Sequence, residues 1–296
     1  MKKLLTILLL TAFFSSPVFL QNSHFKKVPF RLINNMVIVE AQINGQTGSF
    51  ILDTGFPQSV VNPNQVEDLK PVPNQSSVSI FNGVPVSVEQ FEWAGMERQN
   101  MHAVAMNISH LESTAKQKIM GIIGSELLRK SEVMFDFRNQ VVLLYDGKDS
   151  WLHEQHRPQF TLPFDVVRGL PVVRAEFGGQ TYQLGLDIGG RYNLMRENLL
   201  PELPSGLVGQ VTQQKLLDFA NMPDYFDKAP LRGIEIGDQS FDPMNFIFTP
   251  LKKGIPSSIE GMLGLDFLAR YRFAINYHKK TIYFWPHGSE INHRQI

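Results

Sequence analysis

A stretch in the first half of the chain recurs 134 residues later in the second half. Over residues 37–61, eight residues are identical at that spacing, whereas chance would give about one or two. The eight are Val39, Ala41, Gly45, Gln46, Thr47, Leu52, Asp53 and Gly55. Each copy reads as an alternating strand, a glycine turn and a second strand that ends at Asp-x-Gly. The repeat therefore predicts two halves of one architecture.

A second motif is also duplicated, and it lies further along each half. Each copy is a Gly-apolar-apolar-Gly quartet, followed by a short helical stretch and then a hairpin. The quartets are Gly121-Ile122-Ile123-Gly124 and Gly261-Met262-Leu263-Gly264. The helical stretches are 125–130 and 265–270, and the hairpins are 133–145 and 273–285. Because strands are short and frequent, the sequence predicts a mainly β fold with two similar β-rich lobes.

The chain divides into four predicted segments. Residues 1–20 read as a signal peptide, with a basic start, an apolar run from Leu4 to Phe14 and a break at Pro17. A membrane anchor is the alternative, although the run is shorter than the roughly 20 residues of a comfortable span. Residues 24–148 form the N-terminal lobe, 149–160 a polar linker, and 161–290 the C-terminal lobe. We therefore expect export to the periplasm or secretion.

Composition excludes several classes of function. The chain has 28 basic and 28 acidic residues, so nothing predicts a nucleic-acid surface. It has no cysteine, which excludes disulfides, thiol catalysis and cysteine-based zinc sites. His153 and His156 have ligand-like spacing, but we interpret them as a solvated pair in a polar linker, and no metal site is expected. The 22 phenylalanines predict an aromatic core.

The Asp-x-Gly turns are the candidate site. In Asp53-Thr54-Gly55 an apolar strand delivers a carboxylate, Thr supplies a hydroxyl, and Gly permits close backbone approach. Ile51–Gly55 together with Gly121–Gly124 resemble the active-site loop and hydrophobic-hydrophobic-Gly motif of retropepsin and pepsin-like aspartic proteases. The second half, with Asp187-Ile188-Gly189, carries a weaker copy. The resemblance looks closest to exported bacterial proteins with two fused lobes.

The resemblance implies a function as well as a fold. It implies two lobes with a cleft between them, and an aspartic endopeptidase in which Asp53 and Asp187 activate a water molecule. Thr54, Gly55, Ile188 and Gly189 would support the two loops, and the Gly quartets would pack beneath them. The substrate would be a peptide or protein, the enzyme a monomer, and no metal, other cofactor or nucleic acid would be needed. A flap is expected near residues 79–86, with Phe81, Asn82 and Gly83 at its turn.

Three residues depart from the family pattern and leave alternatives open. Ile188 replaces a hydroxyl residue, and Phe56 and Gly190 stand where many family members carry a small residue or serine. One alternative is a catalytically impaired protein that binds peptides in the cleft. Another is a structural or envelope-associated protein with a vestigial cleft.

Overall fold

The structure is a computed structural model that describes residues 25–72, 83–146, 153, 156–217, 223–251 and 255–288. The predicted signal peptide, half of the predicted linker, and residues 79–82 of the predicted flap, which include Phe81 and Asn82, lie outside these residues. Within them the chain is mainly β, as the sequence predicts, and its strands form three sheets.

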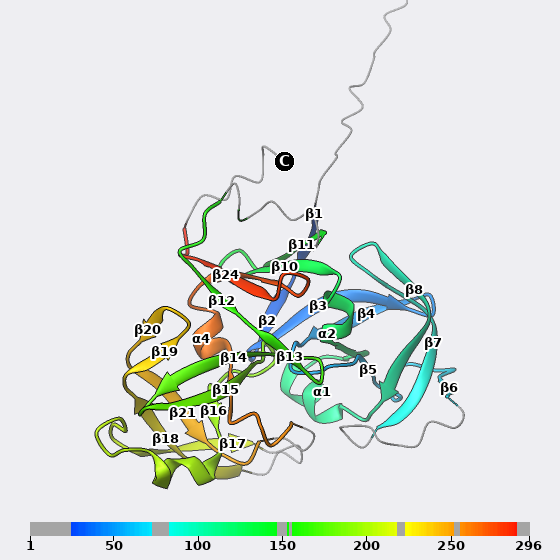
Figure 1. The fold of residues 1–296 in the computed structure, drawn as a ribbon. Coiled ribbons are helices and arrows are strands. Elements are labelled where there is room, and N and C mark those ends of the chain that lie inside the picture. Colours follow the sequence, from blue (N-terminus) through cyan, green and yellow to red (C-terminus); the bar gives the residue numbers. More distant parts are fainter. Residues whose placement is uncertain are drawn as a thin grey trace, which may run out of the picture.

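One sheet contains strands from both halves of the sequence. In spatial order its strands are β1 (Phe25–Pro29), β11 (Val141–Asp146), β10 (Ser131–Asp136), β23 (Arg272–Asn276), β24 (Thr281–Trp285) and β12 (Phe160–Pro163). The two predicted hairpins are β10–β11 and β23–β24, and they meet where β10 pairs antiparallel with β23. This six-stranded sheet lies in the upper part of the molecule in Figure 1 and links the two halves.

A second sheet belongs to the first half. Its strands in spatial order are β2 (Arg31–Ile33), β3 (Met36–Ile43), β4 (Gln46–Leu52), β9 (Gly121–Ile123), β5 (Val60–Val61), β8 (Met96–Ala105), β7 (Val84–Trp93) and β6 (Lys70–Pro71). The β4 strand runs parallel to β9, and β5 runs parallel to β8. Of the two predicted repeat strands, β4 therefore lies beside the first Gly quartet, and β3 lies on the other side of β4.

The third sheet belongs to the second half. Its main path is β17 (Thr212–Leu217), β18 (Pro223–Leu231), β21 (Met244–Phe248), β16 (Leu194–Met195), β22 (Gly261–Leu263), β15 (Gln180–Leu186), β14 (Leu170–Phe177), β19 (Ile234–Ile236) and β20 (Gln239–Phe241), and β13 (Asp165–Val167) pairs with β14. Here β15 runs parallel to β22, and β16 runs parallel to β21. The path β14-β15-β22-β16-β21-β18 thus repeats the path β3-β4-β9-β5-β8-β7 of the first half.

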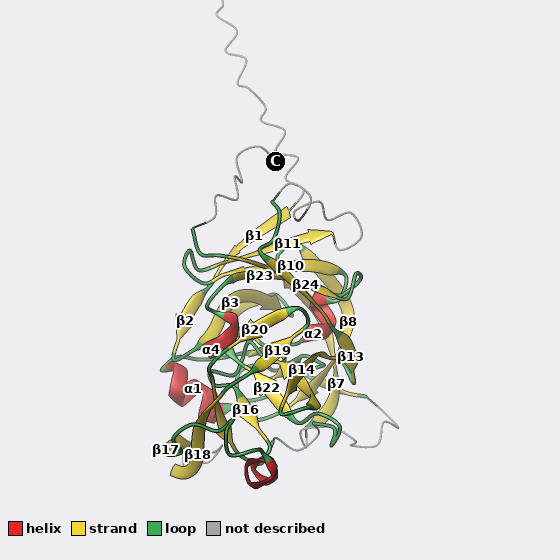
Figure 2. Cartoon of the chain, turned by 60° about the vertical axis from the view of Figure 1, so that its left-hand side comes forward, coloured by secondary structure: helices red, strands yellow, loops and turns green. Residues whose placement is uncertain are grey.

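Helices are few and short in the described residues, as Figure 2 shows. They are α1 (Ser109–Ala115), α2 (Ser125–Leu128), α4 (Leu265–Leu268) and the 3-10 helix η1 (Glu197–Glu202). The α2 and α4 helices each follow a Gly quartet, as the repeat predicts, and each ends two residues before the predicted boundary. None of the helices described is both long and apolar enough to cross a membrane.

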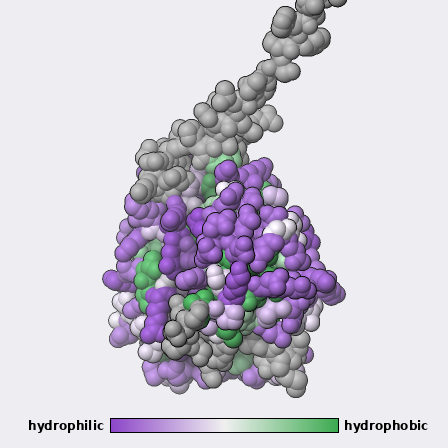
Figure 3. Space-filling model, turned by 90° about the vertical axis from the view of Figure 1, so that its right-hand side faces the viewer, coloured by the Kyte–Doolittle hydropathy of each residue, from purple (hydrophilic) through white to green (hydrophobic). Residues whose placement is uncertain are grey.

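A hydrophobic core continues through both halves. Phe135 of β10 stacks on Phe273 of β23 with ring centroids 5.1 Å apart, so aromatic packing crosses the junction of the halves. Phe284 of β24 extends this stack, since its ring stacks on Phe160 of β12 at 4.5 Å. Full burial of each such side chain contributes about 1.5–3 kcal/mol, so these rings hold the halves together. The face shown in Figure 3 is mostly hydrophilic, with hydrophobic side chains in small separate areas.

The interpretation of His153 as a solvated linker residue is wrong. Its imidazole stacks on the Tyr283 ring at 4.4 Å, and its side chain is only 16% exposed. Its Nδ1 lies 3.8 Å from the buried carboxylate of Glu132, and the His156 carbonyl accepts the indole N–H of Trp285 at 2.7 Å. His153 and the His156 carbonyl therefore contact the six-stranded sheet, because aromatic side chains of β24 lie beside them.

Candidate active site

Asp53 and Asp187 occupy the same position in their two halves. Asp53 follows β4 and donates its backbone N–H to Ile123 of β9 at 3.0 Å. Asp187 follows β15 and donates its N–H to Leu263 of β22, also at 3.0 Å. In each half the parallel partner strand therefore fixes the start of the Asp-x-Gly turn. This explains why an apolar strand and a Gly quartet accompany each aspartate.

Backbone N–H groups orient both carboxylates. Asp53 Oδ1 accepts the N–H of Gly55 at 2.7 Å. Asp187 Oδ1 accepts the N–H of Gly189 at 2.9 Å and that of Gly190 at 3.1 Å. Both side chains are buried, with 5% and 7% of each residue exposed. Gly190 departs from the family pattern, but it adds a donor to one carboxylate.

The two carboxylates lie against each other's loops. A methyl group added at Gly55 would come within 2.6 Å of Asp187 Oδ1, and one added at Gly189 would overlap the carboxylate of Asp53. Neither glycine has a positive φ, so the requirement is space rather than backbone conformation. Residues 134 apart in sequence thus place their carboxylates in the same small volume. Each glycine allows the opposite aspartate to approach.

Thr54 joins the two loops through its hydroxyl. Thr54 Oγ1 donates to the carbonyl of Leu186 at 3.1 Å and accepts the N–H of Ile188 at 3.1 Å. Both Thr54 and Ile188 are completely buried, and Ile188 belongs to the main hydrophobic core. The side chain of Ile188 has no hydroxyl, but its backbone N–H provides one of the two cross-loop bonds.

The Gly quartets support the loops from below, and the support is duplicated. Ser125 donates its N–H to the carbonyl of Phe56 at 2.8 Å, and Leu265 does the same to Gly190 at 2.8 Å. A methyl group at Gly124 would lie 2.8 Å from the Phe56 oxygen. Ile122, Ile123, Met262 and Leu263 are each no more than 3% exposed. The quartets therefore hold the turn that follows each aspartate, and glycine is needed for the close approach.

Two residues of this support were missed in the sequence analysis. Gly124 donates its N–H to Ser59 Oγ at 3.0 Å, and Gly264 donates to Asn193 Oδ1 at 3.1 Å. Ser59 and Asn193 are themselves 134 residues apart, so the repeat held a signal for them. They differ in residue type, which is why a search for identities overlooks them.

Glu126 is a further residue that sequence patterns did not identify. Its Oε1 accepts the N–H of Ser59 at 2.8 Å, so it holds the end of the Asp53 loop. Burial raises the pKa of this carboxyl, although hydrogen bonds from Ser59 and the charge of Arg129 oppose the shift. Its Oε2 has no hydrogen-bond partner among the described residues.

The predicted flap falls partly outside the described residues. The strands β6 and β7 flank residues 73–82 and pair antiparallel. Pro71 lies opposite Val86, and Lys70 lies opposite Ser87. Gly83 is described and buried, and a methyl group there would overlap Val104. The flap position of Phe81, Asn82 and Gly83 stays a prediction.

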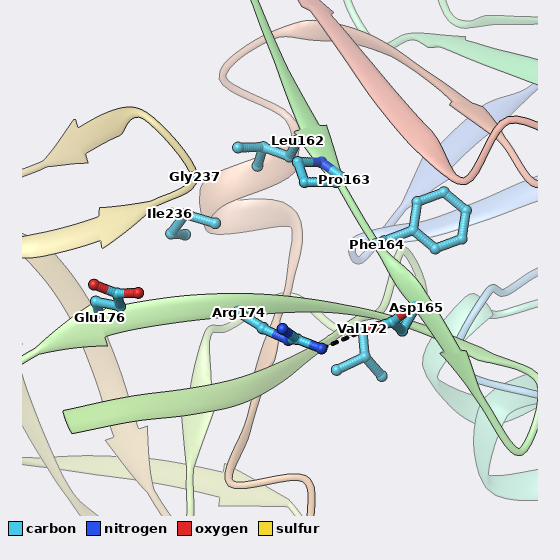
Figure 4. Close-up of a pocket in the computed structure, with 9 residues that line it drawn as sticks. All are labelled: Leu162, Pro163, Phe164, Asp165, Val172, Arg174, Glu176, Ile236 and Gly237. Atoms are coloured by element: carbon cyan, nitrogen blue, oxygen red, sulfur yellow. Dashed lines mark hydrogen bonds and ion pairs between the residues drawn. The ribbon is translucent and has the colours of Figure 1, made fainter.

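A pocket away from these loops lies on the second half (Figure 4). Its volume is about 270 Å3, and none of the predicted site residues lines it. The guanidinium of Arg174 in its wall is paired with Asp165 at 3.2 Å. We assign no ligand to it. Across the described ranges there is no cluster of three or more side chains suited to hold a metal ion.

The chain is similar to a known family over part of its length. A family model described as aspartyl protease matches residues 39–127, which include the Asp53 loop and the first Gly quartet. The match supports an aspartic protease family and a peptidase function for the chain. No curated protein matches the chain.

Proposed function

We propose that this protein is an aspartic endopeptidase whose catalytic pair is Asp53 and Asp187. The observation that carries the proposal is the mutual approach of the two carboxylates, each against the glycine of the opposite loop. Backbone donors orient both carboxylates, and Thr54 fixes one loop relative to the other. A peptide or protein substrate follows from the aspartyl protease match.

The chemistry requires two carboxyl groups in different protonation states. In the proposed reaction one carboxyl group is ionised and the other carries a proton. The ionised group takes a proton from water, whose oxygen bonds to the scissile carbonyl carbon, while the other group donates its proton to the carbonyl oxygen. The tetrahedral intermediate then collapses: the C–N bond breaks, the nitrogen takes the proton that the first group removed from water, a hydroxyl of the intermediate returns a proton to the second group, and the two products separate.

The wider architecture belongs to the same proposal. The two halves would act as lobes that enclose the substrate cleft, since each supplies one aspartate. We propose a monomer, because both aspartates come from one chain and no second copy is needed to complete the pair. We also propose export after removal of residues 1–20, on the strength of the basic start and the apolar run.

The proposal is tested by replacing each aspartate separately. Asp53→Asn and Asp187→Asn should each lower kcat/KM for peptide hydrolysis by at least 1,000-fold, as expected when half of an acid–base pair is lost. Far-UV circular dichroism and thermal unfolding should stay close to wild type. A statine-type transition-state mimic should inhibit the wild-type protein. Wild-type rates in either variant would overturn the pair.

The peptide-binding alternative gives a different result in the same experiment. It predicts saturable binding of peptides without any product over a long incubation. Ile188 is the residue that favours this alternative, because its side chain lacks the hydroxyl that would form a second link between the loops. The two bonds of Thr54 argue for the endopeptidase, since they supply that link from one side.

A further inference from the structure

Two cations and one aromatic ring lie together just beyond the Asp187 loop. Tyr192 follows Asp187 by five residues and is half-buried. The guanidinium carbon of Arg191 lies 4.8 Å from the centre of its ring, and Lys228 Nζ lies 6.0 Å from it. Lys228 comes from β18, so the group joins the active-site loop to the hairpin β17–β18. We name Arg191, Tyr192 and Lys228 the cationic cluster.

The cations of the cationic cluster have no ion-pair partner among the described residues. Neither Arg191 nor Lys228 forms an ion pair with a carboxylate of the described chain. Lys228 Nζ donates to the neutral side chain of Gln214 at 3.5 Å. Asp227, its chain neighbour, points to the opposite face of β18 and accepts from Gln213. Asp224 shares the face of Lys228, but four strand residues, about 13 Å, separate them.

The ring holds these cations in place. A cation above an aromatic face is attracted by its negative π surface, and the attraction grows when water is partly excluded. Arg191 can thus present its N–H donors to a carboxylate in a fixed plane, while the Lys228 ammonium approaches the same ring. A peptide carboxylate placed here would meet two positive charges that lack an acidic partner in the described protein.

The matching positions of the first half carry no charge. Gln58 corresponds to Tyr192 at the repeat spacing of 134, and Pro57 corresponds to Arg191. Pro85 corresponds to Lys228, because Pro85 pairs with Val104 as Lys228 pairs with Ile247. The backbone N–H of Val104 donates to the Ser59 carbonyl, and that of Ile247 donates to the Asn193 carbonyl. Ser59 and Asn193 are equivalent residues, so the two strands correspond. The first half therefore has no counterpart of the cationic cluster, and the cation nearest to these matching positions is Arg129, whose guanidinium lies 3.4 Å from the Pro57 carbonyl oxygen.

We propose that the cationic cluster is a specificity subsite for an acidic side chain of the substrate, which rests on the proposed endopeptidase function. Five residues span at most about 18 Å, so the cluster lies within about five extended substrate residues of the scissile bond. Since the first half has no equivalent, the preference applies to one side of that bond.

Two sets of peptides with a common scissile sequence test the subsite. In each set Glu replaces Gln at one position, up to five residues before or after the scissile bond. We expect one side only to show a preference, with kcat/KM for the Glu peptide at least tenfold above that for its Gln counterpart. Arg191→Gln and Lys228→Gln should each lower this ratio about five- to tenfold, as for loss of one charge-assisted hydrogen bond. Raising the ionic strength should also lower it.

Binding to the Asp53→Asn variant separates this inference from the proposed function. Fluorescence anisotropy with the same peptides measures the Glu/Gln ratio in Kd without any need for cleavage. A Glu preference that Lys228→Gln reduces would support the subsite even if the wild-type protein cleaves nothing. Equal affinity for Glu and Gln peptides at every position would overturn the subsite while leaving the endopeptidase intact. Arg174→Gln, which removes an exposed cation of another pocket, is the control and should leave the ratio unchanged.

Discussion

The hydroxyl of Thr54 lies 3.1 Å from the backbone nitrogen of Ile188, so a residue of the first half is hydrogen-bonded to the turn of the second. The same hydroxyl donates to the Leu186 carbonyl. One side chain thereby satisfies two buried backbone groups across the junction. Both hydrogen bonds use the side chain of Thr54, because the hydrocarbon side chain of Ile188 cannot form one to the first loop.

Replacing Thr54 by Val should uncouple the two loops. The change keeps the shape of the side chain but leaves the Ile188 N–H and Leu186 carbonyl without their partner, at a cost of about 1–3 kcal/mol for each buried group. We expect kcat/KM to fall at least tenfold, with KM less affected than kcat, because the aspartates lose their relative orientation. Thr54→Ser retains the hydroxyl and should preserve most activity. Equal activity in the Val and Ser variants would contradict a coupling role.

A methyl group at Gly189 should push the aspartates apart. The added carbon would overlap the carboxylate of Asp53, which is buried and cannot move freely. We expect Gly189→Ala to abolish peptide hydrolysis while the fold persists by circular dichroism. Gly206→Ala is the matched control, since nothing lies within 4 Å of its added methyl group. Full activity in Gly189→Ala would mean that the carboxylates do not need this approach.

Breaking the buried ion pair between the halves should lower stability strongly. Arg272 of β23 lies 2.7 Å from Asp136 of β10, and both are at most 6% exposed. Arg272→Met leaves a buried carboxylate, so we expect a loss of about 3–5 kcal/mol in the free energy of unfolding by urea. Arg174→Met breaks the exposed pair with Asp165 and should cost under about 1 kcal/mol. Similar losses in the two variants would show that burial does not govern these pairs.

The same pair should stabilise the protein toward neutral pH. Burial by itself raises the pKa of Asp136, but hydrogen bonds from Asn139 and the charge of Arg272 more than offset it and lower the pKa. A lowered pKa means that the folded state favours the ionised form. The stabilisation is thus present above the ordinary value of 3.8 and is lost as pH falls through the folded-state pKa. Arg272→Met should flatten this acid limb of the melting temperature, and an unchanged limb would argue against the linkage.

Glu126 should have the opposite effect on stability. Because burial raises its pKa, the folded state favours the protonated form. Its stabilising contribution is full below the ordinary value of 4.5 and is lost as pH rises through the folded-state pKa. Glu126→Gln should therefore reduce the decline in melting temperature above pH 4.5, whereas the exposed Glu197→Gln should not. If the melting temperature of Glu126→Gln falls above pH 4.5 as much as that of the wild type, the Glu126 carboxyl is not the source of the decline.

The sequence by itself determined the repeat, the mainly β class and the two motifs of each half. Strand alternation, glycine turns and Asp-x-Gly are local patterns, so they can be recognised in the sequence without knowing which distant residues are in contact. The sequence did not identify Ser59 and Asn193, because their different side chains concealed a correspondence at the spacing of 134 that only their matching hydrogen bonds reveal.

Only the tertiary structure decided how the halves meet. The pairing of β10 with β23, the packing of His153 on Tyr283, and the ion pair of Asp136 with Arg272 join residues more than 120 positions apart. The approach of Asp53 to Gly189 spans a similar separation, and Lys228 reaches the Tyr192 ring from 36 residues further along the chain. Such contacts depend on the relative placement of whole sheets, and short-range propensity carries no information about that placement.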